Sequence, residues 1–191
     1  MFKRTFLFAA AMTGMLTFAP LPTPAQNDAD TPAEKPAKNK KKERKAASPV
    51  VTAVKKVKKV KGRVNDKADY YILLYSASWC GPCCQEMPKI VETYEEIKKS
   101  GKVDIILFCQ DKTPAAAKAF VKRFNIKFLT VMGDDDKAPE VPGYSYSGGI
   151  PHCVFVDRNG RKITSGHPGN LMSEWKSFTI DSAKTDSSDE N

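Results

Sequence analysis

The stretch YYILLYSASWCGPC, residues 70–83, carries the most information about the fold of this chain. Its first seven residues are a run of apolar, strand-forming side chains, which predicts a buried strand over residues 70–76. Two cysteines, Cys80 and Cys83, follow the run, and a helical pattern begins after them. A Cys-x-x-Cys pair between a strand and a helix is typical of redox chemistry. The stretch therefore predicts an α/β fold with a redox-active dithiol at the end of one strand.

Thiol–disulfide exchange explains the placement of the two cysteines. At the start of a helix, free backbone N–H groups and the helix dipole stabilise a thiolate, so Cys80 is the expected, exposed nucleophile. Cys83 lies one helical turn later and is the expected resolving thiol, with less exposure than Cys80. Pro82 suits the first turn, because its missing N–H would have no partner there. Gly81 allows another backbone to approach closely.

Strand and helix patterns alternate along the rest of the core. Apolar residues at helical spacing predict a helix over residues 82–99, which ends at Gly101. Thr113 and Pro114 provide an N-cap and a first turn for a helix that runs through Phe124. An Asn-Gly pair at 159–160 predicts a tight hairpin turn. The other predicted elements are strands over 103–109, 128–132, 153–157 and 161–164 and a closing helix over 170–178.

The two ends of the chain differ in composition from this core. Residues 1–25 combine a basic start, an apolar run and a small-residue end, which predicts a secretory signal peptide and a periplasmic or other extracytoplasmic location. A membrane tether by the uncleaved segment is the alternative. Residues 26–49 are rich in Lys, Pro and Ala and lack aromatic residues, which predicts a disordered linker. The folded domain is then expected over residues 50–178, and a disordered tail over residues 179–191.

Positive charge is concentrated in one arm of the chain. The net charge is +9, yet residues 34–63 hold 13 Lys or Arg and two acids, whereas residues 64–191 hold 16 basic and 18 acidic residues. The core is therefore nearly neutral, which argues against nucleic acid as a partner. The arm is interpreted as a solvated spacer, with contact to an anionic envelope surface as the alternative. Residues 50–64 fit either an edge strand guarded by lysines or a basic amphipathic helix.

The run Trp79-Cys80-Gly81-Pro82-Cys83 is identical to the thioredoxin active-site signature. With Glu86 and Pro88 it resembles W-C-x-P-C-x-x-E-x-P, the pattern of exported TlpA-like thiol–disulfide oxidoreductases. The resemblance covers roughly residues 65–178. It implies a thioredoxin-like fold, in which helices flank a central mixed sheet.

The resemblance also implies a substrate-docking surface. Pro151 matches the cis-proline that faces the cysteine pair in this family, with an ordinary trans-proline as the alternative. The backbone of Ile150 would pair with an extended substrate segment. Trp79, Gly81 and Pro82 would complete this surface beside the sulfur atoms.

An acid near the resolving thiol is implied in the same way. General thioredoxins carry a buried acid six residues before the first cysteine, where this chain has Leu74. Glu86, three residues after Cys83, matches the acid of the TlpA-like group and would take the proton of the resolving thiol. A solvated helix carboxylate is the alternative for Glu86.

Three more cysteines lie outside the pair. Cys84 falls at the edge of the apolar stripe of its helix and is interpreted as a semi-buried thiol. Cys109 and Cys153 belong to strands that flank the active-site strand on opposite sides. Two strand spacings separate such positions by about 9.6 Å, beyond the reach of a disulfide, so both are expected to be buried free thiols.

The leading hypothesis is an exported thiol–disulfide oxidoreductase that reduces protein disulfides through the Cys80–Cys83 couple. The intervening Gly-Pro resembles strongly reducing thioredoxins, which favours reduction over oxidation or isomerisation. A monomer without a cofactor is expected, with disulfide-containing proteins as substrates and a separate electron donor, such as a membrane protein. A structural disulfide and half of a zinc site are further readings of the pair. The functional alternative is a copper- or metal-handling chaperone of the same fold, with His152 joining the cysteine cluster.

Overall fold

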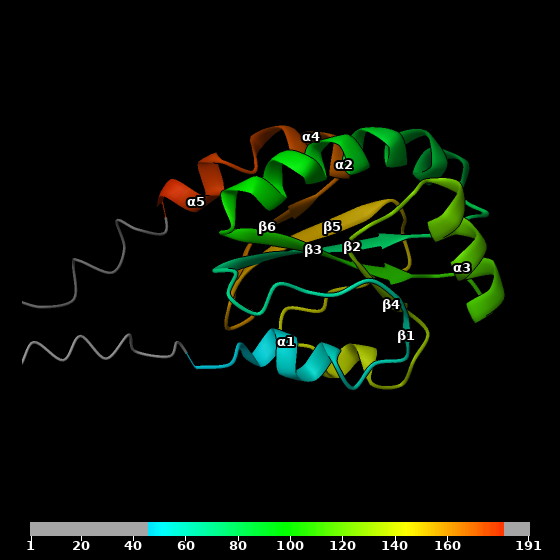
Figure 1. Ribbon diagram of the computed structural model, residues 1–191, viewed down its shortest axis with the longest axis horizontal. Helices are drawn as coiled ribbons and strands as arrows, with labels where there is room; N and C mark the ends of the chain where they lie inside the picture. The colour runs from blue at the N-terminus through cyan, green and yellow to red at the C-terminus, as the bar shows by residue number, and fades with distance from the viewer. Residues whose placement is uncertain (1–45, 182–191) are drawn as a thin grey trace, which may run out of the picture. The chain divides into compact units, whose positions relative to one another are not determined.

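The computed structural model describes residues 46–181. The predicted signal peptide lies outside these residues, as do most of the predicted linker and tail. Six strands form one sheet in the order β1-β4-β3-β2-β5-β6, and helices pack on both of its faces (Figure 1). The predicted architecture, a central mixed sheet flanked by helices, is confirmed.

The strands that carry the site lie at the centre of the sheet. β2 and β3 are parallel, with Ser76 opposite Cys109, and β5 pairs antiparallel with the other side of β2, with Leu74 opposite Cys153. Both cysteine-bearing strands therefore flank the active-site strand, as predicted. The strands are β1 (Lys59–Lys61), β2 (Tyr70–Ser76), β3 (Val103–Cys109), β4 (Leu129–Met132), β5 (His152–Asp157) and β6 (Lys162–Gly166).

Two apolar clusters fill the space between the sheet and its helices. One lies under α2 (Gly81–Ser100), α3 (Pro114–Arg123) and α4 (Pro168–Glu174). The other lies under α1 (Pro49–Val54) and the 3₁₀ helix η1 (Ala138–Glu140), on the opposite face. Because both faces are covered, β2 and β3 read as continuous apolar runs rather than as alternating patterns.

The two longest predicted helices have the boundaries that their sequence signals indicate. The N-cap of α2 is Cys80, and the helix ends at Gly101, whose φ of 67° is unfavourable for residues with a side chain. The side chain of Thr113 accepts a hydrogen bond from the backbone N–H of Ala116 at 3.2 Å and caps α3. Pro88 lies inside α2.

The segment over residues 50–64 contains a helix and a strand in succession, so each of the two readings describes part of it. Val50, Val51 and Val54 of α1 are buried, and β1 pairs antiparallel with β4 at the sheet edge. Ser48 falls within the range predicted as linker, yet its side chain is fully buried. Its Oγ caps α1 and donates a hydrogen bond to the carbonyl of Arg158.

The single closing helix predicted over residues 170–178 is wrong. Two short helices occur instead, α4 and α5 (Ser177–Asp181), with Trp175 and Lys176 between them. Hydroxyl groups of this region bond to carbonyl groups three residues earlier, as Ser177 does to Glu174 at 2.7 Å. Such bonds offer the backbone an alternative to a continuous helix.

The strand directions bring three chain segments together at one edge of the sheet. The carboxyl ends of β2 and β3 meet there because the strands are parallel, and β5 begins there because it is antiparallel. The loop after β2 ends at Cys80, the N-cap of α2, and Cys83 lies in the first turn of that helix. Between residues 46 and 181, no helix combines the length and the hydrophobicity that a membrane span needs.

Candidate redox site

Cys80 and Cys83 form a disulfide at the start of α2, with their Cα atoms 5.2 Å apart. The sulfur of Cys80 accepts a hydrogen bond from the backbone N–H of Cys83 at 3.3 Å. This sulfur therefore occupies the N-cap position, where free N–H groups and the helix dipole favour negative charge. The predicted placement of both sulfur atoms is confirmed.

The prediction of an exposed Cys80 is wrong. The residue is only 7% exposed, because Ala77 and Ile150 pack against the pair. Cys83 is 1% exposed, so the predicted order of accessibility holds. A reaction partner can therefore reach only a small part of Cys80, and it must fit the surface around that residue.

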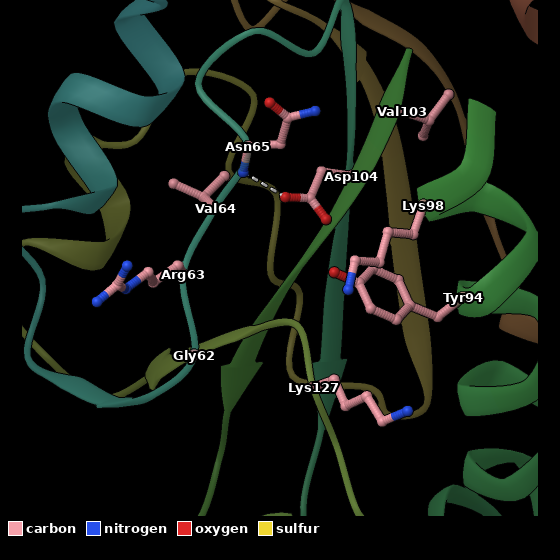
Figure 2. Close-up of a pocket in the computed structure, with 9 residues that line it drawn as sticks. All are labelled: Gly62, Arg63, Val64, Asn65, Tyr94, Lys98, Val103, Asp104 and Lys127. Carbon is pink, nitrogen blue, oxygen red and sulfur yellow. Dashed lines mark hydrogen bonds between the residues drawn. The ribbon is translucent and has the colours of Figure 1, made fainter. Parts of the chain in front are cut away.

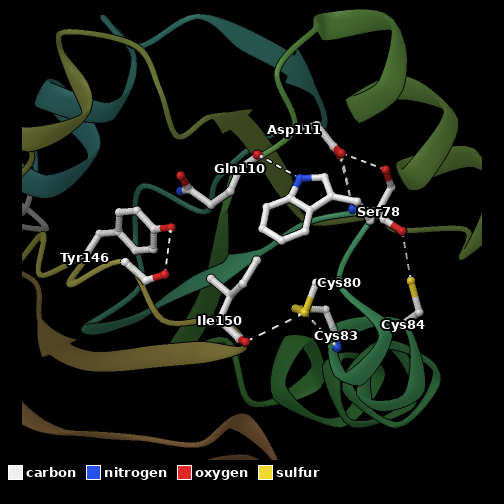
Figure 3. The surroundings of a disulfide bond; sticks show 10 residues. Ser78, Cys80, Cys83, Cys84, Gln110, Asp111, Tyr146 and Ile150 are labelled. Atoms are coloured by element: carbon white, nitrogen blue, oxygen red, sulfur yellow. Dashed lines mark hydrogen bonds between the residues drawn. A yellow bond between two sulfur atoms is a disulfide. The ribbon is translucent and has the colours of Figure 1, made fainter.

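Residues next to the disulfide form an exposed rim on the α2 side. Trp79 is 63% exposed, and its Nε1 donates a hydrogen bond to the carbonyl of Gln110 at 3.2 Å (Figure 3). Pro82 and Gly81 are also exposed. A Cβ added at Gly81 would meet no atom within 4 Å, so no close approach within the protein requires glycine here.

The opposite rim is the loop before β5. The Ile150–Pro151 peptide bond is cis, as predicted, and the Ile150 carbonyl lies 3.7 Å from the Cys80 sulfur. Tyr146 lies on the same side of the disulfide (Figure 3) and stacks on the buried ring of Tyr75 with centroids 5.5 Å apart. The sequence reasoning did not single out Tyr146, since its loop has no recognisable pattern.

Comparison with known proteins agrees with this geometry. The Redoxin family profile matches residues 50–177. The chain belongs to the Redoxin family. Membership covers every element from α1 to the start of α5, and it agrees with the thioredoxin-like and TlpA-like resemblance of the sequence.

Relatives of this Redoxin-family chain include a thiol-disulfide oxidoreductase ResA of Bacillus cereus. That protein is 34% identical over 91 residues, which are 48% of this chain and 50% of the relative. The chain thus spans about half the length of the curated relatives it matches.

Two solved structures share the fold. The solution structure of a thiol:disulfide interchange protein from Bacteroides sp. has a TM-score of 0.53 at 21% identity and covers 64% of this chain and 83% of that chain. The crystal structure of thioredoxin from Wuchereria bancrofti has a TM-score of 0.50 at 23% identity and covers 63% and 93%. At these identities the likeness establishes a thioredoxin-like fold.

Glu86 of the Redoxin domain is half-buried on α2 and faces the first turn of α4. A Cβ added at Gly169 would lie 3.1 Å from its Oε2. Within residues 46–181 the Glu86 carboxylate makes no hydrogen bond or ion pair, so the disulfide form does not join it to Cys83. Leu74 is fully buried, and no acid occupies that position.

A buried acid does occur beside the site, at a position that the sequence reasoning did not identify. Asp111 is 1% exposed and follows β3 by two residues. Its carboxylate accepts hydrogen bonds from the backbone N–H and the hydroxyl group of Ser78. The sequence did contain a signal for this contact. Ser78 and Asp111 each follow a strand by two residues, and the carboxyl ends of parallel strands share one edge of a sheet.

The three remaining cysteines are free thiols, as predicted. Cys84 is half-buried, and Cys109 and Cys153 are fully buried. Burial raises the pKa of the Cys153 thiol to about 12. Burial and the adjacent Asp111 carboxylate also raise the pKa of Cys109. Both buried thiols are therefore protonated and unreactive at neutral pH.

The metal-handling alternative finds no ligand set in the described part of the chain. No three His, Cys, Asp or Glu side chains between residues 46 and 181 are grouped to hold a metal ion. His152 instead stacks on Tyr75, with ring centroids 6.1 Å apart. Burial, followed by the nearby Lys162, lowers the pKa of His152.

Proposed function

We propose that this Redoxin-family protein is a thiol–disulfide oxidoreductase that reduces disulfide bonds in proteins. The observation that carries the proposal is the Cys80–Cys83 disulfide at the N-terminus of α2, with the more accessible of the two residues at the N-cap. The names of the relatives support the same reaction class. The rims formed by Trp79 and Ile150 are the proposed docking surfaces, together with Gly81, Pro82 and Pro151.

In the reducing direction, both cysteines begin as thiols. The Cys80 thiolate attacks one sulfur of the substrate disulfide, and the other substrate sulfur leaves as a thiolate that takes up a proton. Cys83 then loses its proton and attacks Cys80, which releases the second substrate thiol and forms the Cys80–Cys83 disulfide. Two electrons pass from the protein to the substrate in each cycle.

Glu86 is the proposed acceptor of the Cys83 proton. It lies one helical turn after Cys83, and its carboxylate is half-buried without a hydrogen-bond partner in the described chain. A carboxylate in this setting is free to bond to a thiol or a water molecule when the disulfide opens. Asp111 is not needed as the acceptor, because it already has hydrogen-bond donors on both of its oxygens.

The reducing direction rests on the Gly-Pro pair between the cysteines. A reduction potential near that of thioredoxin, about −270 mV, is expected, whereas strong oxidants lie near about −120 mV. Equilibration of the purified protein with glutathione or dithiothreitol buffers measures this value. A potential near the oxidising end would exclude the reductase direction and leave the oxidoreductase class intact.

We also propose that the protein acts outside the cytoplasm, because residues 1–25 have the composition of a signal peptide. A monomer would then receive electrons from a separate donor, for which a membrane protein is the natural candidate. The basic arm would act as a solvated spacer. N-terminal sequencing of the protein from the producing cell tests cleavage after this segment.

A trapping experiment tests the proposed function. In a Cys83→Ser variant the mixed disulfide on Cys80 cannot be resolved, so substrates are expected to accumulate as covalent complexes that dithiothreitol releases. The matched control is the Cys80→Ser, Cys83→Ser double variant, which keeps Cys84 and should trap nothing. Absence of complexes with the single variant, while Cys80 still reacts with iodoacetamide, would contradict the proposal.

A further inference from the structure

The carboxylate of Asp111 binds groups from two segments beside the redox site. Ser78 donates from its hydroxyl group to Oδ1 at 2.6 Å, and its backbone N–H lies 3.3 Å from both oxygens. The thiol of Cys109 donates to Oδ2 at 3.1 Å. No Lys, Arg or His among residues 46–181 forms an ion pair with this carboxylate. Since a buried carboxylate is costly without compensation, these donors are what make Asp111 tolerable at this position.

The Cys109 thiol is a dependable donor in this arrangement. Burial and the neighbouring carboxylate both disfavour its ionised form and raise its pKa. It therefore keeps its proton at neutral pH and points it to Asp111. The thiol thus serves as a hydrogen-bonding group here, and it forms no disulfide.

Ser78 is held from its other side as well. The thiol of Cys84 donates to the Ser78 carbonyl at 3.3 Å (Figure 3). The next residue, Trp79, is fixed by its bond to the Gln110 carbonyl. All three polar groups of Ser78, namely its N–H, hydroxyl and carbonyl, are therefore occupied within the protein. This accounts for Cys84, which the exchange chemistry does not use.

We propose that Asp111 is a positioning residue of the redox site and that the thiols of Cys84 and Cys109 assist it by fixing Ser78. Ser78 precedes Cys80 by two residues, so a shift of Ser78 moves both the Trp79 rim and the attacking sulfur. Misplacement by about 1 Å can lower a catalysed rate by about a hundredfold. The proposal deepens the thiol–disulfide exchange proposed above and rests on it.

The first test replaces Asp111 with asparagine in the full chain. The amide keeps the shape of the carboxylate but turns one acceptor into a donor that faces other donors. We expect kcat/KM for insulin reduction to fall by about tenfold or more, chiefly through kcat. In a Trp175→Phe background, which leaves Trp79 as the single tryptophan, we expect a red shift and lower anisotropy of its emission.

The matched control is Asp104→Asn, which alters the other buried aspartate of the β3 region, far from the disulfide. This variant should lower the free energy of unfolding. Its kcat/KM should stay within about twofold of wild type, and the wavelength and anisotropy of the Trp79 emission should not change. If Asp111→Asn behaves like Asp104→Asn in both readouts, Asp111 is a structural residue only and the proposal is overturned.

A second pair of variants keeps the test decisive if Asp111→Asn does not fold. Cys84→Ser retains a donor for the Ser78 carbonyl, whereas Cys84→Ala removes it. We expect the serine variant to keep a kcat at least about twice that of the alanine variant. Equal kcat values for the two variants would show that the rate does not depend on how Ser78 is fixed, and the proposal would be overturned.

Failure of the proposed function gives a different result. In that case wild type itself does not reduce insulin, whereas the opening of its disulfide by dithiothreitol and the Trp79 emission still respond to Asp111→Asn if the positioning role is correct. Unchanged values of both in the variant would overturn the positioning role alone.

Discussion

A buried aspartate lies near each end of strand β3, and the two residues serve different parts of the molecule. Asp104 is the second residue of the strand and is 4% exposed; Asp111 follows the strand and is 1% exposed. Both lack an ion-pair partner within the described residues. They differ in the groups that donate hydrogen bonds to them. From this difference we interpret Asp104 as a residue that stabilises the fold and Asp111 as a residue that positions the redox site.

Asp104 accepts hydrogen bonds from the backbone N–H groups of Asn65 and Ile105 at 2.5 and 2.9 Å. It forms part of a cavity of about 660 Å³ at the end of the sheet away from the disulfide, with the phenol of Tyr94 facing it (Figure 2). The Asn65 N–H joins the segment before β2 to this carboxylate. Asp111, in contrast, accepts from two side chains, the Ser78 hydroxyl and the Cys109 thiol, as well as from the Ser78 N–H. The same residue type therefore stabilises the domain at one end and orders chemistry at the other.

The largest effect is expected when the nucleophile is removed. Cys80→Ser should abolish insulin reduction, with a loss of at least about a thousandfold, because a hydroxyl group is a poor nucleophile at its free pKa. The free energy of unfolding of the reduced protein should change little. An assay of turnover alongside urea unfolding measures both quantities. Residual turnover in this variant would assign the reaction to another thiol.

Alkylation of the reduced protein should distinguish cysteines near the redox site from cysteines in the core. Cys80 and the half-buried Cys84 should react with iodoacetamide at pH 8, whereas Cys109 and Cys153 should react more than about a hundredfold more slowly than in urea, since only the thiolate is reactive. Peptide mass spectrometry over time measures each site separately. Rapid native-state labelling of Cys153 would contradict its burial and its pKa of about 12.

The sequence predicts those features of the molecule that depend on neighbouring residues, and it misses those that depend on residues far apart in the chain. The strand over residues 70–76, the N-cap at Cys80, the cap at Thr113 and the cis bond at Pro151 follow from nearby residues or from a motif. The burial of Cys80 does not, because it depends in part on Ile150, seventy positions away. Asp111 also escaped prediction, since an isolated Asp after a strand is ordinary until the parallel register sets it beside Ser78.

Asp104→Asn tests the stabilising end of the comparison. The amide oxygen can accept from only part of the donor set, and the amide N–H₂ would face the N–H groups of Asn65 or Ile105. We expect a loss of about 1–3 kcal/mol in the free energy of unfolding, measured by urea denaturation at neutral pH. Specific activity of the folded protein should be unchanged. A loss of activity without a loss of stability would reverse the roles assigned to the two aspartates.

The pH dependence of that loss provides a finer test. Burial, the largest cause, raises the pKa of Asp104 above its usual range, so the folded state binds this proton more tightly than the unfolded chain. The contribution of Asp104 to the free energy of unfolding of wild type therefore falls as pH rises from about 4 to the folded pKa. The Asp104→Asn variant lacks this titration. The free energy of unfolding of the variant should fall furthest below that of wild type at low pH, and this difference should shrink as pH rises. A difference that grows with pH would contradict the raised pKa of Asp104.

The smallest effect is expected at the rim of the same cavity. Lys127 pairs with Glu95 at 2.6 Å, and the two side chains are 50% and 45% exposed. Lys127 also lowers the pKa of Glu95 by a hydrogen bond and by its charge. Exposed pairs contribute little, because water and salt screen them. Lys127→Ala should leave the urea midpoint and insulin reduction unchanged within error. A measurable fall in either quantity would mean that surface charge at this end of the sheet contributes to stability or activity. The difference between Asp104 and Asp111 would then depend on nearby charge as well as on their hydrogen-bond partners.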